Sequence, residues 1–460
     1  MGRRTGGRIG GPCGRMETFD VVVIGAGAAG LLAARRLAEA GRRVVVLEAR
    51  DRVGGRISSE EPRGWRGAVE LGAEFVHSGN EVLEAVLKEA KVRKRPIEER
   101  HWLAGDGRQA RMDDAWDRIY AVMGKIGPRF RGDFARWLER HGDDVPAPDR
   151  ALAEAFVKGF NGAPLERMSA RALFEASKED EEQFRPSKRY ASVAEILARQ
   201  LVGAGGRVEL RREVRRVVWS RGGVQVVDRR GDGWSGRCAL VTLPLGVLKA
   251  KDGERGAVRF EPRLAGKEKV LANIESGHAR RVVLRMREDI WRRGPIPAAM
   301  RAREGRAFGF MHSEEDAFPV WWSEAPRPVL VGWTGGPAAA AMSGWSEAKV
   351  VRAACAALAK LLGCAEKQVR AAVLEARTHD WAADPFTRGA YSFAVAGAEQ
   401  APERLARAVG GVLFFAGEAT ADVLELGTVH GALASGERAA REMERRLAKW
   451  RPMRDGGMTR

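Results

Sequence analysis

The stretch VVVIGAGAAGLLAARRLAEAGRRVVVLEARDRVGGR, residues 21–56, decides the fold of this chain. It opens with four β-branched residues, Val21–Ile24, bounded by glycine, a pattern typical of a fully buried parallel strand. A glycine-rich turn then leads into the segment Leu31–Ala40, whose alanine and leucine content predicts a helix. The stretch therefore predicts a strand, a turn and a helix of a doubly wound α/β fold.

The turn, GAGAAG, is a G-x-G-x-x-G pattern in which each glycine has a separate role. Gly25 permits the tight turn, Gly27 lets the backbone approach a pyrophosphate, and Gly30 lets the helix pack close to the strand. Ala29 belongs to the same turn, where the positive end of the helix would meet the phosphates. The next apolar strand, VVVL, ends at Glu48, where an acid is expected to bind a ribose hydroxyl. The pattern predicts a dinucleotide-binding site.

The residues after Glu48 favour FAD over NAD. The segment EARDRVGGR places Ala49, Arg50, Gly54, Gly55 and Arg56 directly after the ribose acid. A nicotinamide dehydrogenase has no obvious need for a second glycine pair and two arginines there, whereas a larger and more anionic cofactor lying along the chain does. The alternative interpretation is a basic turn in a basic protein.

Composition limits the classes of protein that fit. A chain of 460 residues with 45% hydrophobic content is long enough for two domains with cores of their own. The four cysteines form no C-x-x-C pair, so the sequence predicts no metal site and favours a cytoplasmic location with reduced thiols. No apolar run reaches the roughly 18 residues of a membrane span, so no membrane partner is expected.

The net charge of +18 is spread along the chain and interleaved with acids. This distribution is typical of a solvated surface and predicts no specific nucleic-acid partner. Residues 1–16 carry four arginines and no acid, and we expect a disordered basic tail there. Residues 450–460 are expected to form a second tail. The sequence indicates no oligomeric state.

Secondary-structure signals alternate along the rest of the chain. Residues from about 81 to 200 follow a helical pattern, and strands are expected in RVELRREVRRVVW, GVQVVDRR and CALVTLPLGVL. Strands RRVVLRM and PVLVGW and a helix AKVVRAACAALAKLLG follow. A buried strand then delivers Gly417 and Glu418, and Thr428 is a good N-cap for a helix that begins at Val429. The positive end of that helix would favour the reduced, more negative form of a flavin by about 0.3–2 kcal/mol.

Seven motifs occur in the order that the flavin-dependent amine oxidases show, and the chain resembles that family, which includes monoamine oxidases, polyamine oxidases and histone demethylases. They are GAGAAG, LEARDRVGGR, ELGAEFVH, VTLPLGVL, RGAYS, FFAGEAT and TVHGALASG. The resemblance implies an α/β fold with a Rossmann-type FAD-binding domain built from residues 17–80, 204–254 and 402–449. It implies an α+β substrate-binding domain built from residues 81–203 and 255–401.

The resemblance also implies which residues hold the cofactor. Glu48 takes the adenosine ribose, Val214 meets the adenine through its backbone, and Glu418 faces the ribityl and pyrophosphate part. Arg56 lies along the cofactor together with Gly72, Ala73, Glu74 and Phe75. Monoamine oxidases attach the flavin to a cysteine just before the active-site tyrosine, whereas this chain has Ala390 before Tyr391. FAD is therefore expected to be non-covalent.

Four residues are expected to serve catalysis. Tyr391 matches one wall of the family's aromatic cage, Thr428 stands where a second tyrosine would be, and Trp381 is expected as another wall. His77 matches a histidine that polyamine oxidases place near the substrate nitrogen, although a histidine that caps a loop is the alternative. Arg281 stands where the family has a lysine that holds a water near the reactive flavin nitrogen. Arginine keeps the charge but is larger and cannot lose its proton, and the alternative is a structural strand residue.

These observations lead to a main hypothesis and two alternatives. The main one is an FAD-dependent amine oxidase that transfers hydride from the carbon beside the nitrogen of a small-molecule amine, with O2 as the acceptor and H2O2 as product. The first alternative is an FAD-dependent dehydrogenase of an amino acid or an isoprenoid that uses another acceptor. The second is a flavin-binding protein without turnover.

Overall fold

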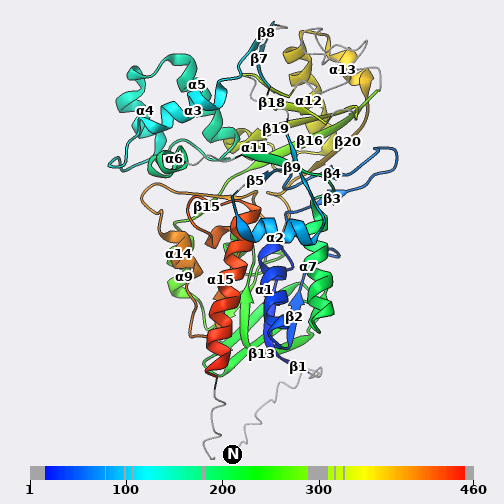
Figure 1. Cartoon of the computed structure of the whole chain (residues 1–460), viewed down its shortest axis with the longest axis vertical. Helices are drawn as coiled ribbons and strands as arrows, with labels where there is room; N and C mark the ends of the chain where they lie inside the picture. Colours follow the sequence, from blue (N-terminus) through cyan, green and yellow to red (C-terminus); the bar gives the residue numbers. More distant parts are fainter. Residues whose placement is uncertain are drawn as a thin grey trace, which may run out of the picture.

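The computed structural model describes residues 16–77, 79–97, 100–105, 108–178, 182–287, 309–314, 317–324 and 327–450. Most of the two predicted tails, residues 1–15 and 451–460, lies outside these ranges. The described elements form two large sheets, one in the lower and one in the upper half of Figure 1, with helices packed on both.

The lower, eight-stranded sheet contains the strands that flank the glycine-rich turn. Its strands are ordered β10-β2-β1-β13-β12-β11-β14, and β22 pairs with β13. Their bounds are β1 Glu17–Ile24, β2 Val44–Leu47, β10 Arg207–Glu209, β11 Val214–Ser220, β12 Gly223–Asp228, β13 Gly233–Val241, β14 Arg259–Glu261 and β22 Leu413–Phe415. β1 is parallel to β2 and β13, and every residue of β2 is buried, as a run of apolar β-branched residues predicts.

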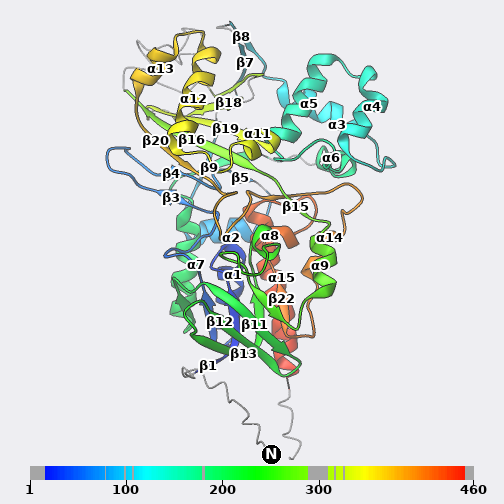
Figure 2. The same cartoon turned by 180° about the vertical axis from the view of Figure 1, so that it is seen from behind.

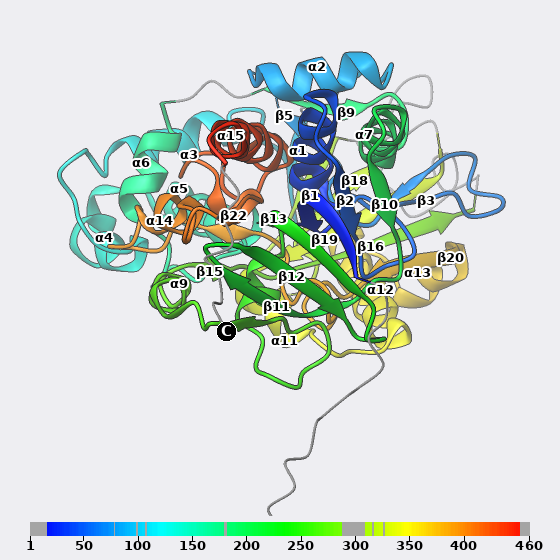
Figure 3. The same ribbon diagram turned by 90° about the horizontal axis from the view of Figure 1, so that it is seen from below.

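Helices α1, α7 and α15 cover one side of this sheet, as the view in Figure 3 shows. Together with α2 and smaller helices of this half, their bounds are α1 Ala28–Glu39, α2 Glu81–Glu89, α7 Ala191–Gly203, α15 Val429–Ala448, α8 Leu245–Leu248, α9 Ala265–Leu271, α14 Ala401–Ala406 and η4 Glu418–Thr420. α15 lies very close to α1, because a Cβ at Gly436 would be 2.4 Å from the carbonyl oxygen of Ala29. This packing brings the N-terminal turn of the chain and the last long helix together.

The upper, seven-stranded sheet has the order β20-β16-β19-β18-β17-β7-β8. Its bounds are β7 His101–Gly105, β8 Arg108–Arg111, β16 Ala279–Met286, β17 Phe310–His312, β18 Val320–Ser323, β19 Val329–Gly335 and β20 Val373–His379. Figure 2 shows α12 and α13 beside this sheet and a separate group of helices, α3 to α6, at its other end. Their bounds, with two short helices, are α3 Ala115–Gly124, α4 Phe134–His141, η1 Gly142–Asp144, α5 Ala147–Gly159, α6 Ala170–Ala176, α11 Gly336–Ala341, α12 Glu347–Leu362 and α13 Glu366–Ala372.

Three small sheets lie between the two large ones in Figure 1. Their strands are β3 Ser59–Glu60 with β4 Val69–Glu70, β5 Val76–His77 with β9 Gln183–Pro186 and β6 Lys94–Pro96, and β15 Glu275–Ser276 with β21 Ser392–Phe393. They carry the segments that the sequence places near the cofactor and the substrate.

The predicted α/β fold class is confirmed, and three details differ from the sequence prediction. α1 begins at Ala28, within the glycine turn, three residues before the predicted start. The region expected to be helical also contains β6, β7, β8 and β9. α7, which the predicted boundaries place in the substrate-binding domain, packs in one core with α1, because Val193, Leu197 and Leu201 cluster with Val21 and Leu31.

Candidate active site

The three glycines of the first turn meet different surroundings. Gly25 has a φ of +109°, and a Cβ there would lie 2.7 Å from Thr242 Oγ1. A Cβ at Gly30 would lie 2.2 Å from the carbonyl oxygen of Gly25, so only glycine lets α1 approach the strand this closely. A Cβ at Gly27 would instead have no atom of the described residues within 4 Å. The open space beside Gly27, at the N-terminus of α1, fits an anionic group.

The second glycine pair packs against the first turn. The Gly54 amide donates to the carbonyl of Ala26 at 2.8 Å, and a Cβ at Gly55 would lie 3.7 Å from the Gly27 Cα. Both glycines have positive φ, +102° for Gly54 and +59° for Gly55. Arg52 donates to three carbonyls of the same loop, including that of Gly55 at 3.0 Å. The loop is thus held as a second backbone wall beside Gly27.

Glu48 lies at the end of β2, where the sequence predicts a ribose contact. Its side chain is buried and accepts hydrogen bonds from the Ala26 amide at 2.8 Å and the Arg50 amide at 2.9 Å. Because a carboxylate has about four acceptor sites, it still has capacity for a ribose hydroxyl. The Arg212 amide donates to the Glu48 carbonyl at 2.7 Å, which brings Val214, the first residue of β11, close to Glu48. Ala49 lies between these contacts.

The Arg50 guanidinium is directed toward Asp384. It donates to both Asp384 carboxylate oxygens at 2.9 Å and to Thr387 Oγ1 at 2.9 Å. Burial raises the pKa of Asp384, but hydrogen bonds from His379 and Arg50 outweigh it and hold the pKa well below its usual range. Arg50 therefore anchors the loop before Tyr391 to the first glycine-rich segment.

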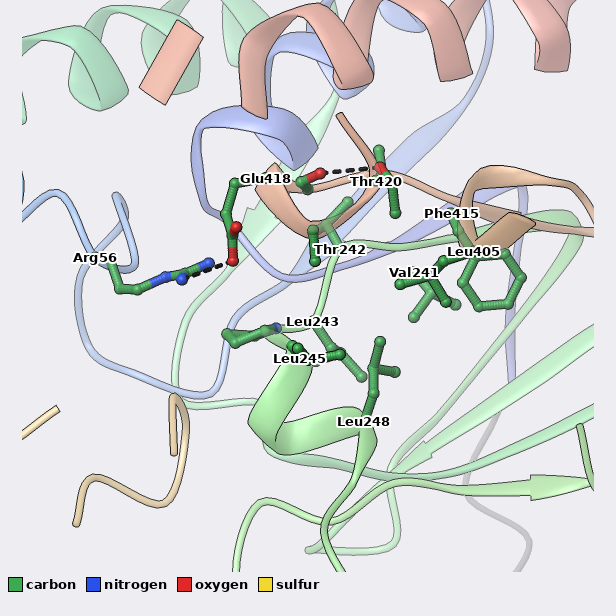
Figure 4. Close-up of a pocket in the computed structure, with 14 residues that line it drawn as sticks. Arg56, Val241, Thr242, Leu243, Leu245, Leu248, Leu405, Phe415, Glu418 and Thr420 are labelled. Carbon is green, nitrogen blue, oxygen red and sulfur yellow. Dashed lines mark hydrogen bonds and ion pairs between the residues drawn. The ribbon is translucent and has the colours of Figure 1, made fainter. Parts of the chain in front are cut away.

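Arg56 and Glu418 meet at the centre of the candidate site, and Figure 4 shows their side chains pointing toward each other. Arg56 Nη1 donates to Glu418 Oε1 at 2.8 Å and to the Ala390 carbonyl at 2.6 Å. The buried Glu418 carboxylate also accepts from the Ser392 amide at 3.1 Å, from Ser392 Oγ at 3.2 Å and from the Gly427 amide at 3.1 Å. One carboxylate thus joins three distant segments of the chain.

A small pocket lies beside this contact. Figure 4 shows Arg56 and Glu418 on one side of it and the apolar residues of α8 on another. Its lining also includes Gly417, whose φ is +125° and whose Cβ position has no atom of the described residues within 4 Å. A backbone with two such open glycines, Gly27 and Gly417, leaves room for a ligand that touches the main chain.

Tyr391 lies between Ala390, whose carbonyl accepts from Arg56, and Ser392, which donates to Glu418. Its Oη donates to the carbonyl of Phe160 at 2.8 Å, and burial raises its pKa. A Cβ at Gly427 would lie 3.2 Å from the Tyr391 Cβ, so the turn before α15 packs on the tyrosine. Thr428 caps α15 by accepting the Gly431 amide at 2.9 Å, and Val429 begins the helix, as predicted.

Two of the predicted catalytic residues donate hydrogen bonds to the backbone of the segment Glu70–Ala73. Arg281 Nη1 donates to the carbonyls of Glu70 at 2.7 Å and Gly72 at 2.8 Å, and Trp381 Nε1 donates to the Leu71 carbonyl at 2.9 Å. A Cβ at Gly72 would lie 1.8 Å from the Arg56 carbonyl oxygen, so this close approach requires glycine. Arg281 and Trp381 therefore both act on the position of this segment.

The remaining predicted residues, Glu74, Phe75 and His77, directly follow that segment in the sequence. The Phe75 ring contacts Trp322, with the ring centroids 5.8 Å apart, and Glu74 pairs with Arg281 at 3.1 Å. His77 lies on β5 next to the first turn of α15, where its ring centroid is 5.5 Å from that of His430. These contacts bring His77 to α15 and place Phe75 under the upper sheet.

Several residues that organise this site were not predicted from the sequence: Ser392, Gly427, Asp384, Phe160, His430 and Arg185, which donates to Glu74 at 2.9 Å. Ser392 and Gly427 lie inside or next to motifs that were recognised, so their position was the available signal. Phe160 contributes its backbone carbonyl, which any residue supplies, and no sequence signal marks it.

The described side chains fit an organic anion better than a metal ion. Within the described ranges, no group of three or more His, Cys, Asp or Glu is arranged to hold a metal. The donor set instead consists of backbone amides, a ribose-type acceptor at Glu48 and open glycine backbone, which is the set that a dinucleotide uses. No helix in the part of the chain that the structure describes is long and apolar enough to cross a bilayer.

Known proteins resemble this chain over most of its length. The family model for flavin containing amine oxidoreductases matches residues 28–444. Lysine-specific histone demethylase 2 of Homo sapiens is 26% identical over 458 residues, which cover 92% of this chain and 53% of that protein. The chain thus spans about half the length of that demethylase. Polyamine oxidase 2 of Arabidopsis thaliana is 27% identical over 476 residues, which cover 94% of this chain and 90% of that protein.

Among solved structures, wild-type putrescine oxidase bound to putrescine superposes with a TM-score of 0.76 at 22% identity. The match covers 94% of this chain and 100% of that one, and at this identity it shows a shared fold. The family match extends from the first helix of the glycine-rich unit to the last turns of α15. The chain belongs to the flavin containing amine oxidoreductase family.

Proposed function

We propose that this protein is an FAD-dependent amine oxidase that removes a hydride from the carbon beside the nitrogen of a small-molecule amine, with O2 as the acceptor and H2O2 as product. The contact between Arg56 and Glu418 carries the proposal, because it joins the glycine-rich cradle to the segment of Tyr391 and to the turn before α15. One buried carboxylate thereby connects the residues expected around the cofactor with those expected around the substrate.

FAD, when bound, would supply the hydride acceptor. We assign Glu48 to its ribose and the open backbone at Gly27 and Gly417 to its phosphates and ribityl chain. The N-terminus of α15, which Thr428 caps, follows Gly427, whose amide donates to Glu418, and a helix N-terminus favours negative charge nearby. Ala390 offers no thiol, so the assignment is to non-covalent FAD.

The substrate residues would act by holding the reacting carbon and keeping the amine uncharged. Tyr391 and Trp381 are assigned as walls, and the aromatic rings of Phe75, Phe310 and Trp322 lie with centroids 5.8–6.4 Å apart on the side of the upper sheet. Such apolar surroundings lower the pKa of an amine by desolvation, which favours the neutral form that donates hydride. The His77 imidazole is assigned as a hydrogen-bond acceptor for the substrate N–H.

The purified protein is expected to be yellow and to release its flavin on denaturation. Because Ala390 provides no sulfur for a covalent bond, acid precipitation should leave FAD in the supernatant. The measurement is the absorbance spectrum of the supernatant and of the redissolved pellet. Flavin that stays with the precipitated chain would contradict non-covalent binding.

Anaerobic reduction by amines tests the proposed reaction directly. The holoenzyme is mixed under nitrogen with a monoamine, a short diamine, spermine and, separately, with L-amino acids, and flavin bleaching is followed in a stopped-flow instrument. Amine oxidation predicts fast bleaching by at least one amine and slow or no bleaching by amino acids. Bleaching by amino acids alone supports a dehydrogenase of another substrate, and no bleaching by any compound supports a flavin-binding protein without turnover.

One observation favours the second candidate, a dehydrogenase with another electron acceptor. The guanidinium of Arg281, which replaces the family's lysine, is paired with Glu74 at 3.1 Å. If a free cation promotes reaction with O2, a paired one promotes it less. Admitting air to the amine-reduced enzyme separates the candidates, because an oxidase regains its colour within seconds and produces H2O2.

A further inference from the structure

Among the described residues, protein groups surround the side chain of Arg281. Its side chain is 5% exposed, and its Nη1 donates to the carbonyls of Glu70 and Gly72. Its guanidinium carbon lies 5.6 Å from the ring centroid of Trp322 and 5.4 Å from that of Trp333. Because Nη1 donates to both carbonyls while Nη2 lies 3.1 Å from Glu74, the planar guanidinium keeps one orientation, which a flexible lysine would not.

Glu74 is the counter-ion of this arginine. Its side chain is 3% exposed, Oε2 lies 3.1 Å from Arg281 Nη2, and Oε1 accepts from Arg185 Nε at 2.9 Å and Trp322 Nε1 at 3.1 Å. Burial raises the pKa of Glu74, but the charges of Arg281 and Arg185 outweigh it and hold the pKa below its usual range. Glu74 is therefore ionised beside Arg281.

The other acids near this pair are poorer counter-ions. Burial raises the pKa of Glu70 to about 7, and burial together with the charge of Glu74 raises the pKa of Glu324. Glu324 has its own partner in Arg327. Glu74 is thus the carboxylate that balances Arg281.

We propose that Glu74 and Arg281 form one buried charge pair that positions the segment Glu70–Ala73 at the cofactor and cancels most of the positive charge that Arg281 would present there. The proposal rests on the proposed function, because it concerns the potential at bound FAD. In this arrangement Arg281 is a positioning residue, and Glu74 sets how much of its charge the cofactor experiences.

A charge cycle tests the pair. The variants are Arg281→Met, Glu74→Gln and the double variant, each studied as holoenzyme and as apoprotein. Arg285→Met is the matched control, because Arg285 lies on the same strand four residues further on, pairs with Glu375 at 3.5 Å and is 28% exposed. It removes the same charge and a similar volume without touching the pair.

The first readout is the midpoint potential of the bound flavin. If Arg281 and Glu74 had only structural roles, the two single variants would not shift this potential in opposite directions. Reduction adds negative charge to the flavin, so Arg281→Met should lower the potential and Glu74→Gln should raise it. We expect each single change to shift the ratio of reduced to oxidised flavin at least tenfold at a fixed potential, about 30 mV for a two-electron couple. The double variant should return to within threefold of the wild-type ratio, and the control should stay within twofold.

The second readout is thermal unfolding of the apoprotein. Glu74→Gln leaves the buried Arg281 without its carboxylate, and Arg281→Met leaves Glu74 with Arg185 as its one remaining counter-ion among the described residues. Both changes should therefore lower the melting temperature, and the double variant should be more stable than the sum of the two losses predicts. Arg281→Lys separates charge from position, because it keeps the charge and loses the planar group that contacts the two carbonyls and Glu74 together. It should keep the potential near that of the wild type and weaken FAD binding at least threefold.

Several results would overturn the proposal. Potentials that fall in both single variants, or a double variant whose shift equals that of Arg281→Met alone, would show that Glu74 does not balance Arg281. Additive losses of apoprotein stability would show that the two side chains do not act as a pair. A wild-type protein that binds no FAD would refute the proposed function instead, while the apoprotein cycle would still report on the pair.

Discussion

Gly27→Ala is expected to abolish FAD binding while leaving the apoprotein folded. Gly27 has a φ of −78° that alanine adopts readily, and a Cβ there would have no atom of the described residues within 4 Å. The protein thus has room for the methyl group, but the proposed pyrophosphate position does not, because the methyl would project into the space that the phosphates need. Displacing the phosphates from two backbone amides costs about 1.5–3 kcal/mol for each bond to a charged group. FAD affinity should therefore fall at least a hundredfold.

The measurement is titration of apoprotein with FAD, together with thermal unfolding of the apoprotein. The melting temperature of Gly27→Ala should lie within about 3 °C of the wild type, the shift that roughly 1 kcal/mol produces in a large domain. Gly30→Ala is the contrasting variant, because its Cβ would lie 2.2 Å from the Gly25 carbonyl oxygen, and it should destabilise the apoprotein itself. Wild-type FAD affinity in Gly27→Ala would place the phosphates elsewhere.

The sequence predicts well those elements whose signals lie close together along the chain, such as the turn that contains Gly27 and Gly30. The first strand, the glycine turn and β2 follow from signals within a few residues of each other, and the structure contains all three. The end of the chain behaves similarly, because Thr428 caps α15 as its side chain predicts. Local steric and hydrogen-bonding rules decide these elements, so a single sequence carries enough information.

Elements that depend on distant partners were predicted less well. The strand β7 lies in a region with a helical pattern and pairs with β17, more than 200 residues further along the chain. α7 has an ordinary amphipathic pattern, which gives no indication that its apolar face packs on α1. Such pairings are decided by tertiary packing, which overrides local propensity.

The candidate site shows the same limit. Motifs indicated Arg56, Glu418 and Arg50 individually, but their separations in sequence, 362 residues for Arg56 and Glu418 and 334 for Arg50 and Asp384, hide the ion pairs. Arg281 was expected as a catalytic cation, and its pairing with Glu74 could not be inferred from either residue type alone. An ion pair with a residue distant in sequence changes the charge that a motif residue presents, although the motif itself stays the same.

Glu418→Gln is expected to lower FAD affinity and turnover by two to three orders of magnitude. Both carboxylate oxygens face donors: Oε1 accepts from Arg56 and Ser392 Oγ, and Oε2 accepts from the amides of Ser392 and Gly427. A glutamine of the same shape must place its NH2 group against one of these donor pairs, whichever way the amide is turned. Removing one partner of a buried ion pair costs roughly 3–5 kcal/mol, and about 1.4 kcal/mol corresponds to a factor of ten.

The effect should extend to both sides of the site, because Glu418 holds the residues that flank Tyr391 and Thr428. FAD binding to the apoprotein and anaerobic stopped-flow reduction should therefore both be impaired, and the apoprotein should lose stability.

Glu442→Gln is the matched control: Glu442 lies on α15 in an i,i+4 pair with Arg438, and both side chains are about 30% exposed. Exposed pairs contribute at most about 1 kcal/mol, so this variant should retain FAD affinity and turnover within a fewfold of wild type. Equal behaviour of Glu418→Gln and Glu442→Gln would mean that the Arg56–Glu418 contact does not join the cofactor site to the substrate site, and the observation that carries the proposed function would be lost.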